Sequence, residues 1–453
     1  MKRVFVDYAS LMKLTFKKKI LFSLLAVLVS IFFVVVVIEV YYRLQDDRLS
    51  FDTIDDRPIV MHPERGLSFA PGKNTRKANG IDYDVTQKAN KHGFLDRNHE
   101  LKKADDTYRI LIIGDSFVEA AQVPIEKKIQ VLLDRKLKGK LLGLKVESIA
   151  MAFSGMGTAN QLVYYRTLGK DFNPDLVVLV FISNDFANNS PILHSLAEGW
   201  FPYSGPRFFY EINFANDSKK FIPFPINFNY LSNVRNVTMP LDVPMRLPLE
   251  TWKMDSFFSW SKAYRDVSTD LKEKNRKKNQ QVENFDVIAQ RLQYLKNHKI
   301  YDHKALEASI KDKFKDWDYP NDVSPQTGFF LKSTSMPKIF REALQLTELS
   351  LVVFNQEVTN NKSKFLVMSG AYLSSEKPQK TWGREVDDGG LIGKLKGITT
   401  KFQIPLLDLY PEFEKRGGVE KTKWKKDSHW NEKGHEWAAD ALSQYILKNK
   451  IIK

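Results

Sequence analysis

The sequence predicts an α/β protein built on a parallel sheet, with a large inserted region and one amino-terminal transmembrane helix. From residue 109 onward, short apolar runs alternate with segments of helical periodicity. This alternation stops over residues 187–340 and then resumes, and a separate apolar stretch covers residues 20–38. Strands that alternate with helices imply parallel pairing through right-handed crossover connections. We therefore expect one α/β domain that is interrupted by an insertion and preceded by a membrane anchor.

Length and composition limit the chemistry of the chain. At 453 residues it exceeds one average domain, which fits a single α/β domain with an insertion. The absence of cysteine excludes disulfides, thiolate metal sites and a cysteine nucleophile. The formal net charge is +15, but the densest basic cluster, at residues 272–278, is typical of a solvated helix face. Contact with an anionic polymer or lipid head groups is the alternative, and a nucleic-acid partner is not expected.

The apolar stretch at residues 20–38 is interrupted only by Ser23 and Ser30. A helix of this length spans roughly 30 Å, which is enough to cross a bilayer. No small-x-small cleavage site follows it, so the sequence favours an uncleaved anchor over a signal peptide. Basic residues dominate the segment before it, whereas acidic residues offset the basic ones after it. We expect residues 1–19 in the cytoplasm, residues 20–42 in the inner membrane, and the remainder in the periplasm or outside the cell.

Residues 43–108 are polar and rich in turn signals, of which Pro71-Gly72 and Asn79-Gly80 are the clearest. We expect this lead-in segment to pack beside the main sheet.

The α/β domain is expected over residues 109–186 and 341–453. Its strands are predicted from short apolar runs, at residues 110–113, 146–152, 176–182, 365–369 and 404–409. Its helices are predicted from apolar residues at helical spacing, at residues 125–137, 159–168, 338–360 and 434–447. The intervening region, 187–340, combines Pro- and aromatic-rich loops with charged helical stretches. Because it follows a strand end, a lid or substrate wall is favoured over pure scaffolding.

Polar motifs follow three of the predicted strands directly. They are Gly114-Asp115-Ser116, the turn at residues 154–157, and Ser183-Asn184-Asp185. In an open parallel sheet, sites gather beyond the carboxyl ends of the strands. A serine nucleophile also needs a base and a group that orients the base, and Asp427-Ser428-His429 offers both. The motifs therefore predict a serine esterase or acyltransferase.

These motif blocks resemble the SGNH, or GDSL-type, hydrolase family, in order from Gly114 to Gly434 and with the insertion skipped. The resemblance implies a three-layer, flavodoxin-like sheet of the esterase type. It also implies Ser116 as the nucleophile, His429 as the general base and Asp427 as the carboxylate that orients His429.

The oxyanion would be held by the backbone N–H groups of Ser116 and Gly155 and by the side chain of Asn184. The closing block from Asp427 to Asn431, followed by Gly434 and His435, is similar to that of membrane-anchored bacterial members and of alginate O-acetylation proteins.

The sequence departs from the family pattern at two places. The family more often separates its last Asp and His by two residues, whereas here only Ser428 intervenes. We therefore expect the Ser116–His429 contact more firmly than the Asp427–His429 contact. The second block usually reads Asn-x-Gly, but residues 150–152 are Ala-Met-Ala, so Gly157 competes with Gly155 as an oxyanion donor.

Each candidate residue also has a structural interpretation. Ser116 could cap a helix, Gly155 and Asn184 could serve turns and strand ends, and Asp427 and His429 could cap or pack. We expect Asp115 to brace the nucleophile turn and Asp408 to act as a scaffold residue at a strand end. No metal or other cofactor is expected, because His429 and His435 are the one histidine pair of note and lack ligand spacing.

The expected substrate is an acylated glycan, and an acetyl ester is favoured. One alternative is an O-acyltransferase, which would need a membrane partner that supplies acyl groups. A second is a catalytically inactive, membrane-tethered protein that binds glycan or assists assembly. A third is a lipase-like enzyme in which the aromatic-rich residues 200–230 form an acyl channel.

Overall fold

The computed structural model describes residues 16–44, 54–62, 65–141, 143–190, 193, 209–211, 222–224, 326–378, 383–449 and 451. The expected insertion at residues 187–340, its role as a lid or wall, and the acyl channel at 200–230 fall mostly outside these residues, so they stay predictions. Within that region β9 (Phe209–Glu211) and β10 (Ile222–Phe224) form an antiparallel pair. The helix α1 and the α/β domain belong to separate compact units and are described in turn.

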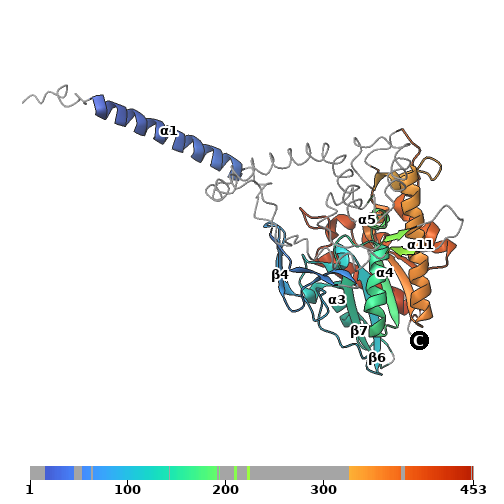
Figure 1. Cartoon of the computed structure of the whole chain (residues 1–453). Helices are drawn as coiled ribbons and strands as arrows, with labels where there is room; N and C mark the ends of the chain where they lie inside the picture. The colour runs from blue at the N-terminus through green and yellow to red at the C-terminus, as the bar shows by residue number, and fades with distance from the viewer. Residues whose placement is uncertain are drawn as a thin grey trace, which may run out of the picture. The chain divides into compact units, whose positions relative to one another are not determined.

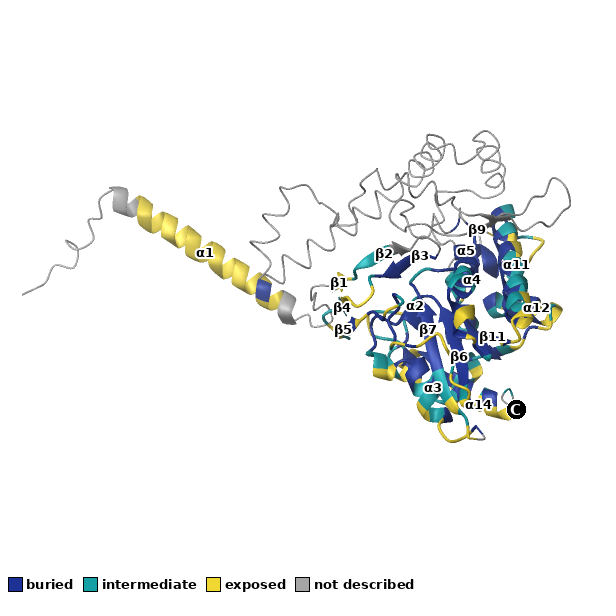
Figure 2. Cartoon of the chain, turned by 60° about the horizontal axis from the view of Figure 1, so that its bottom comes forward, coloured by how far each residue is buried: buried dark blue, intermediate teal, exposed yellow. Residues whose placement is uncertain are grey.

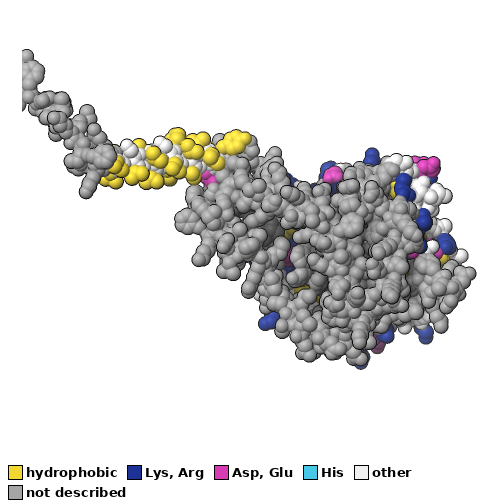
Figure 3. Space-filling view, turned by 45° about the horizontal axis from the view of Figure 1, so that its top comes forward, with side chains coloured by type: hydrophobic (Ala, Val, Ile, Leu, Met, Phe, Trp, Pro, Cys, Tyr) yellow, Lys and Arg dark blue, Asp and Glu magenta, His cyan; other side chains and the backbone are white. Residues whose placement is uncertain are grey.

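Helix α1 (Phe16–Leu44) contains the apolar stretch Ile20–Tyr41, with a mean hydropathy of 3.2. Its apolar side chains are exposed along this stretch (Figures 2 and 3). Among the described residues it is the one helix long and apolar enough to cross a membrane. Length and composition of this kind are shared by membrane spans and signal sequences.

The α/β domain is built on a five-stranded sheet in which all strands run parallel. Its strands are β6 (Thr107–Gly114), β7 (Lys145–Ala152), β8 (Leu176–Phe181), β11 (Lys364–Ser369) and β12 (Leu406–Asp408). They lie in the order β12-β11-β8-β6-β7. Numbered along the chain, this order reads 5-4-3-1-2, the flavodoxin-like arrangement of a doubly wound sheet. The predicted fold class is therefore confirmed.

Helices cover both faces of the sheet, so the strands are buried on two sides, as parallel strands require (Figures 1 and 2). Alternate residues of β6 show the division: Leu111 and Ile113 belong to one apolar core, and Ile110 and Ile112 to the other. The first core is covered by α4 (Thr158–Thr167), α11 (Lys338–Asn360) and α12 (Gly390–Lys401). The second is covered by α3 (Ile129–Leu137), α13 (Tyr410–Lys415) and α14 (Glu432–Lys448).

Short helical segments follow the strands or connect the larger helices. Two of them are the α-helices α2 (Ser116–Glu119) and α5 (Ser183–Asn188). The 3₁₀ turns are Ile125–Lys127, Gly169–Phe172, Thr327–Phe330, Ala371–Ser374 and Val419–Thr422.

The helix expected over residues 125–137 is interrupted. Lys128 has extended backbone angles and separates the 3₁₀ turn Ile125–Lys127 from α3. Its side chain is fully buried and donates from Nζ to the carbonyl oxygens of Leu95 at 3.0 Å and Glu119 at 2.7 Å. The two hydrogen bonds of Lys128 are tertiary contacts, which the helical spacing of apolar residues could not predict.

The lead-in contains two small antiparallel sheets, with the orders β1-β4-β5 and β2-β3. The strands are β1 (Ile54–Asp56), β2 (Ile59–His62), β3 (Gly66–Phe69), β4 (Asn74–Ala78) and β5 (Asp84–Lys88). Asn79 forms the turn between β4 and β5, where its Oδ1 accepts the N–H groups of Ile81, Asp82 and Tyr83. Leu67 of β3 lies in the core that also contains Leu111, so the lead-in packs on the α/β domain.

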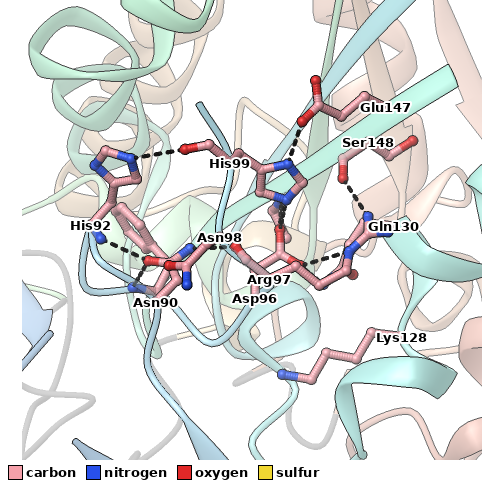
Figure 4. A network of polar contacts seen from close by, with 12 residues as sticks. Asn90, His92, Asp96, Arg97, Asn98, His99, Lys128, Gln130, Glu147 and Ser148 are labelled. Atoms are coloured by element: carbon pink, nitrogen blue, oxygen red, sulfur yellow. Dashed lines mark hydrogen bonds and ion pairs between the residues drawn. The ribbon is translucent and has the colours of Figure 1, made fainter. Parts of the chain in front are cut away.

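A buried polar network joins the end of the lead-in to the sheet (Figure 4). The buried carboxylate of Asp96 accepts the N–H of Ala150 at 2.8 Å and Gln130 Nε2 at 3.0 Å. His99 lies between two carboxylates, with Nε2 3.2 Å from Asp96 and Nδ1 2.7 Å from Glu147. Burial lowers the pKa of His99, but these two carboxylates outweigh it and raise the pKa to about 8. The protonated ring can donate to both carboxylates at once.

Candidate active site

Ser116 lies at the turn from the buried strand β6 into helix α2. The Asp115 side chain caps this helix by accepting the N–H of Phe117 at 3.1 Å. Gly114 leaves room for the turn, since a Cβ there would lie 2.5 Å from Cγ2 of Val118. Ser116 itself is partly exposed, whereas its neighbours on both sides are buried. The turn therefore presents a hydroxyl at the carboxyl edge of the sheet.

The loop before α14 brings a carboxylate and an imidazole together. Oδ1 of Asp427 accepts a hydrogen bond from Nδ1 of His429 and another, at 2.9 Å, from the His429 N–H. Burial raises the pKa of Asp427, but its hydrogen bonds and the charge of His429 outweigh burial and hold that pKa well below its usual range. Asp427 is thus an ionised acceptor. With the ring proton on Nδ1, Nε2 of His429 is left as a proton acceptor.

The segment after His429 is fixed by packing and capping. Trp430 is buried, with its ring centroid 5.3 Å from that of Phe117. Asn431 caps α14 by accepting the N–H of Gly434 at 3.0 Å, and its Nδ2 donates to the carbonyl of Lys423 at 2.7 Å. A Cβ on Gly434 would lie 2.7 Å from Cβ of Trp430, so the tight fit at this position requires glycine. The loop is therefore held at a defined place on the domain.

The imidazole of His429 packs beside the turn that carries Ser116. Its ring centroid lies 5.1 Å from that of Phe117, the residue that follows Ser116. Within the described part of the chain, however, Ser116 Oγ hydrogen-bonds to Asp115 Oδ2, at 3.5 Å, and not to His429. The sequence predicted the Ser116–His429 contact more strongly than the Asp427–His429 contact, and this ranking was wrong. The Asp427–His429 bond is formed despite the short spacing, and the Ser116–His429 bond is not.

Asn184 lies at the start of α5, directly after β8, and reaches the nucleophile turn. Its Nδ2 donates to Asp115 Oδ2 at 3.1 Å. Asp115 thus braces the turn, as expected. Burial raises the pKa of Asp115 to about 6, although its hydrogen bonds with Phe117 and Asn184 act in the other direction.

A second buried carboxyl, that of Asp185, lies near Asp115. Asp185 accepts the N–H of Ile182 at 2.7 Å and Nε2 of Gln161 at 3.1 Å. Burial and the charge of Asp115 raise the pKa of Asp185 well above its ordinary value. Both effects favour the protonated form of Asp185 beside an ionised Asp115, which keeps two like charges apart.

The turn after β7 carries Gly155 and Gly157, the two glycines that the sequence offers as alternative oxyanion donors. Gly155 has φ +69°, a conformation that favours glycine, and its carbonyl accepts Nδ2 of Asn188 at 3.2 Å. Gly157 has an ordinary negative φ, but a Cβ there would lie 2.7 Å from the backbone carbon of Asn188. Close packing on α5 therefore accounts for Gly157, whereas the positive φ of the turn accounts for Gly155.

Glu119 connects this turn to the nucleophile helix, a contact that the sequence did not indicate. It is buried and accepts the Ser154 N–H at 2.5 Å and the Ser154 hydroxyl at 2.9 Å. Its other oxygen pairs with Arg57 of the lead-in at 3.0 Å. Neither Glu119 nor Arg57 is part of a recognisable motif, and their proximity arises only from the tertiary fold.

One histidine and one acid that the sequence singled out, His435 and Asp408, have other partners. His435 is buried and its Nδ1 accepts the N–H of Ile129 at 3.3 Å; burial lowers its pKa to about 3. Asp408 accepts Ser369 Oγ at 3.0 Å and the N–H of Tyr410 at 3.1 Å at the end of β12. In the described ranges no group of three or more His, Asp or Glu residues could hold a metal ion.

No family model matches the chain, and the comparison with curated proteins found no match. Solved structures similar to it include a lipase/acylhydrolase from Enterococcus faecalis, at 11% identity and a TM-score of 0.34, covering 76% of this chain and 96% of that one. A GDSL-like lipase from Bacteroides thetaiotaomicron VPI-5482 has 11% identity and a TM-score of 0.30, covering 75% and 88%. The acetyl xylan esterase AlAXEase has 12% identity and a TM-score of 0.33, covering 75% and 99%. Because these identities and TM-scores are low, the fold class is assigned from the strand order of the chain's own sheet.

Proposed function

We propose that the chain is a membrane-anchored serine esterase that removes O-acyl groups, acetyl above all, from a glycan outside the cytoplasm. One observation carries the chemistry: the His429 imidazole is held by Asp427 and packs on Phe117, the residue that follows Ser116. A hydroxyl, an imidazole and an ionised carboxylate at one edge of a sheet are the groups that nucleophilic ester cleavage requires.

In the proposed reaction, Ser116 Oγ leaves its 3.5 Å contact with Asp115 and turns to Nε2 of His429. That contact is at the limit of a hydrogen bond, and the hydroxyl can rotate about a single bond. His429 takes the hydroxyl proton as Oγ bonds to the acyl carbon, and it returns the proton to the departing sugar oxygen. A water molecule then attacks the acyl carbon, with His429 taking its proton. The bond between the acyl carbon and Ser116 Oγ breaks, His429 returns the proton to Oγ, and the carboxylic acid leaves.

Three donors would hold the oxyanion: the N–H groups of Ser116 and Gly155, and Nδ2 of Asn184. The Asn184 amide has two hydrogens, so the bond that it donates to Asp115 leaves one for substrate. Each such donor contributes about 10²- to 10³-fold to the rate.

An O-acyltransferase would use the same first half-reaction, with a sugar hydroxyl in place of water in the second. It would need a membrane partner that supplies acyl groups, and α1 would place the chain beside such a partner. Glycan acetylation in a deletion strain separates the two activities. A rise supports the esterase, whereas a fall supports the transferase.

One observation favours a second candidate, a tethered glycan-binding or assembly protein without catalysis. The Ser116 hydroxyl is directed to Asp115 and not to His429. Labelling of the full chain with a fluorophosphonate probe decides between the two, because the probe reacts only with an activated serine. We expect labelling of wild type and none of Ser116→Ala, together with loss of acetyl-ester turnover; equal turnover by the two proteins would reject Ser116 as the nucleophile.

The proposed location can be tested with a single cysteine, because the chain has none of its own. Lys140 is exposed in a turn after α3, so Lys140→Cys offers a reactive thiol on the α/β domain. We expect a membrane-impermeant maleimide to label this variant in cells whose inner membrane is intact. Labelling only after lysis would place the domain in the cytoplasm and reject the proposed orientation.

A further inference from the structure

The Asp427 carboxylate is held from two sides. Its Oδ1 serves His429, and its Oδ2 accepts hydrogen bonds from Tyr83 OH at 2.8 Å and Gln122 Nε2 at 3.0 Å. Tyr83 belongs to the lead-in and Gln122 to the segment after the nucleophile helix. Neither residue was singled out by any motif.

The hairpin that carries Tyr83 is fixed to the loop that carries Asp427. The Asp82 carboxylate accepts the backbone N–H groups of Lys425 at 3.2 Å and Lys426 at 2.8 Å. The Tyr83 ring packs on Trp424, with centroids 5.3 Å apart. The hairpin tip therefore contacts three parts of the loop: its backbone N–H groups, the Trp424 ring and the Asp427 carboxylate.

The segment that carries Gln122 is tied to the same lead-in. Gln87 of β5 donates from Nε2 to the carbonyl oxygen of Ala121 at 3.0 Å. Gln122 is itself buried, so its amide has a defined direction. Both donors to Oδ2 of Asp427 thus depend on the strands β4 and β5.

The short spacing between Asp427 and His429 makes this support necessary. Oδ1 of Asp427 accepts the His429 backbone N–H as well as the ring N–H, and the first of these bonds forms an ordinary turn without any imidazole contact. A carboxylate held by that turn alone could rotate away from the ring. Two neutral donors on Oδ2 prevent rotation and leave the negative charge available to the imidazolium that forms during catalysis.

We propose that Tyr83 and Gln122 are positioning residues for the Asp427–His429 pair, and that the lead-in hairpin is therefore part of the catalytic apparatus. This inference rests on the proposed serine-hydrolase function. It assigns a role in the reaction to a segment that precedes the α/β domain. The two side chains act through Asp427 and do not touch the reacting atoms.

The test uses two independent variants of the full chain. Tyr83→Phe removes the hydroxyl and keeps the ring on Trp424, and Gln122→Met removes the amide at similar volume. We expect each to lower kcat for an acetyl ester by about 10- to 100-fold, as for loss of a hydrogen bond to a charged group, with KM unchanged. The matched control is Tyr165→Phe, which removes a buried hydroxyl that accepts Asn361 Nδ2 at 3.1 Å; we expect wild-type kcat.

A double-mutant cycle separates positioning from general loosening of the hairpin. In an Asp427→Asn background, Tyr83→Phe should change the rate of fluorophosphonate labelling less than twofold, because its partner is already altered. A full-sized loss in that background, a rise in KM alone, or wild-type kcat in both single variants would overturn the inference while leaving an active enzyme. If wild type neither turns over ester nor reacts with the probe, the proposed function fails and the inference fails with it.

Discussion

The rings of Phe117 and His429 face each other with centroids 5.1 Å apart, so the helix that starts at Ser116 also supports the imidazole. Phe117 further contacts Trp430 at 5.3 Å and Tyr372 at 5.6 Å. One aromatic side chain therefore links the turn at Ser116, the His429 ring and the core beneath them.

Phe117→Leu should weaken catalysis more than it weakens the fold. The leucine keeps most of the buried volume but no longer provides a ring for His429, and small displacements of a base cost about 10- to 100-fold in rate. We expect kcat for an acetyl ester to fall by that factor. The control is Phe354→Leu in the opposite core, where the ring lies 5.1 Å from Phe365; a similar drop in Tm with unchanged kcat is expected there. Equal kcat losses in both variants would contradict the special role of Phe117.

Asn184→Ala distinguishes an oxyanion donor from a simple brace. If Asn184 donates to the developing charge, its loss should cost on the order of 3 kcal/mol of transition-state stabilisation, seen as a fall in kcat. If it only braces Asp115, to which it donates at 3.1 Å, stability would fall and kcat would not. Steady-state kinetics and thermal unfolding of the same preparation measure both. Asn361→Ala, which removes a remote donor to Tyr165, is the control for loss of one amide.

Much of the sheet could be predicted from the sequence because its strands are apolar runs. All six residues of β8 are buried, and α11 occupies the range that its periodicity predicted. The Gly114-Asp115-Ser116 motif likewise indicated that Ser116 follows a strand, and the Asp427-Ser428-His429 motif contains the carboxylate and the imidazole that hydrogen-bond to each other. Local pattern suffices for these elements, because burial on two faces leaves a continuous apolar signature.

The supports of the site could not be predicted in this way. Tyr83 and Asp427 are 344 positions apart, and no local pattern relates them. Glu119 and Ser154 meet because β6 and β7 end at the same edge, with Gly114 opposite Ala152. Asp115 and His429 are alternative acceptors for the Ser116 hydroxyl. Neither composition nor spacing predicts which of the two it bonds.

The ion pair between buried Glu119 and half-buried Arg57 should be important for both stability and activity. Glu119→Gln removes the charge that pairs with Arg57 and leaves one side-chain oxygen where two now accept from Arg57 and Ser154, so we expect a loss of about 3 kcal/mol in the free energy of unfolding. Because Ser154 precedes Gly155, kcat should also fall. The control is Glu432→Gln, which breaks an exposed pair with Lys127 and should cost less than about 1 kcal/mol. Denaturation by urea measures both, and equal losses would reject the structural role of the buried pair.

His99 should make the stability of the domain depend on pH. Its pKa is about 8 in the folded protein against an ordinary value of 6.5, because Asp96 and Glu147 outweigh the effect of burial. Its contribution of about 2 kcal/mol is therefore complete below pH 6.5 and is lost as pH rises through 8. The urea midpoints of wild type and His99→Gln should differ most at pH 6 and converge by about pH 9. Burial also lowers the pKa of Lys128, to about 7, but this group is present in both proteins, so its titration cancels in the difference between them. His92→Gln is the control. Because burial lowers the pKa of His92, the stability of wild type relative to this variant should rise, not fall, as pH rises. A difference between wild type and His99→Gln that stays constant with pH would show that the His99 ring is not charged in the folded protein.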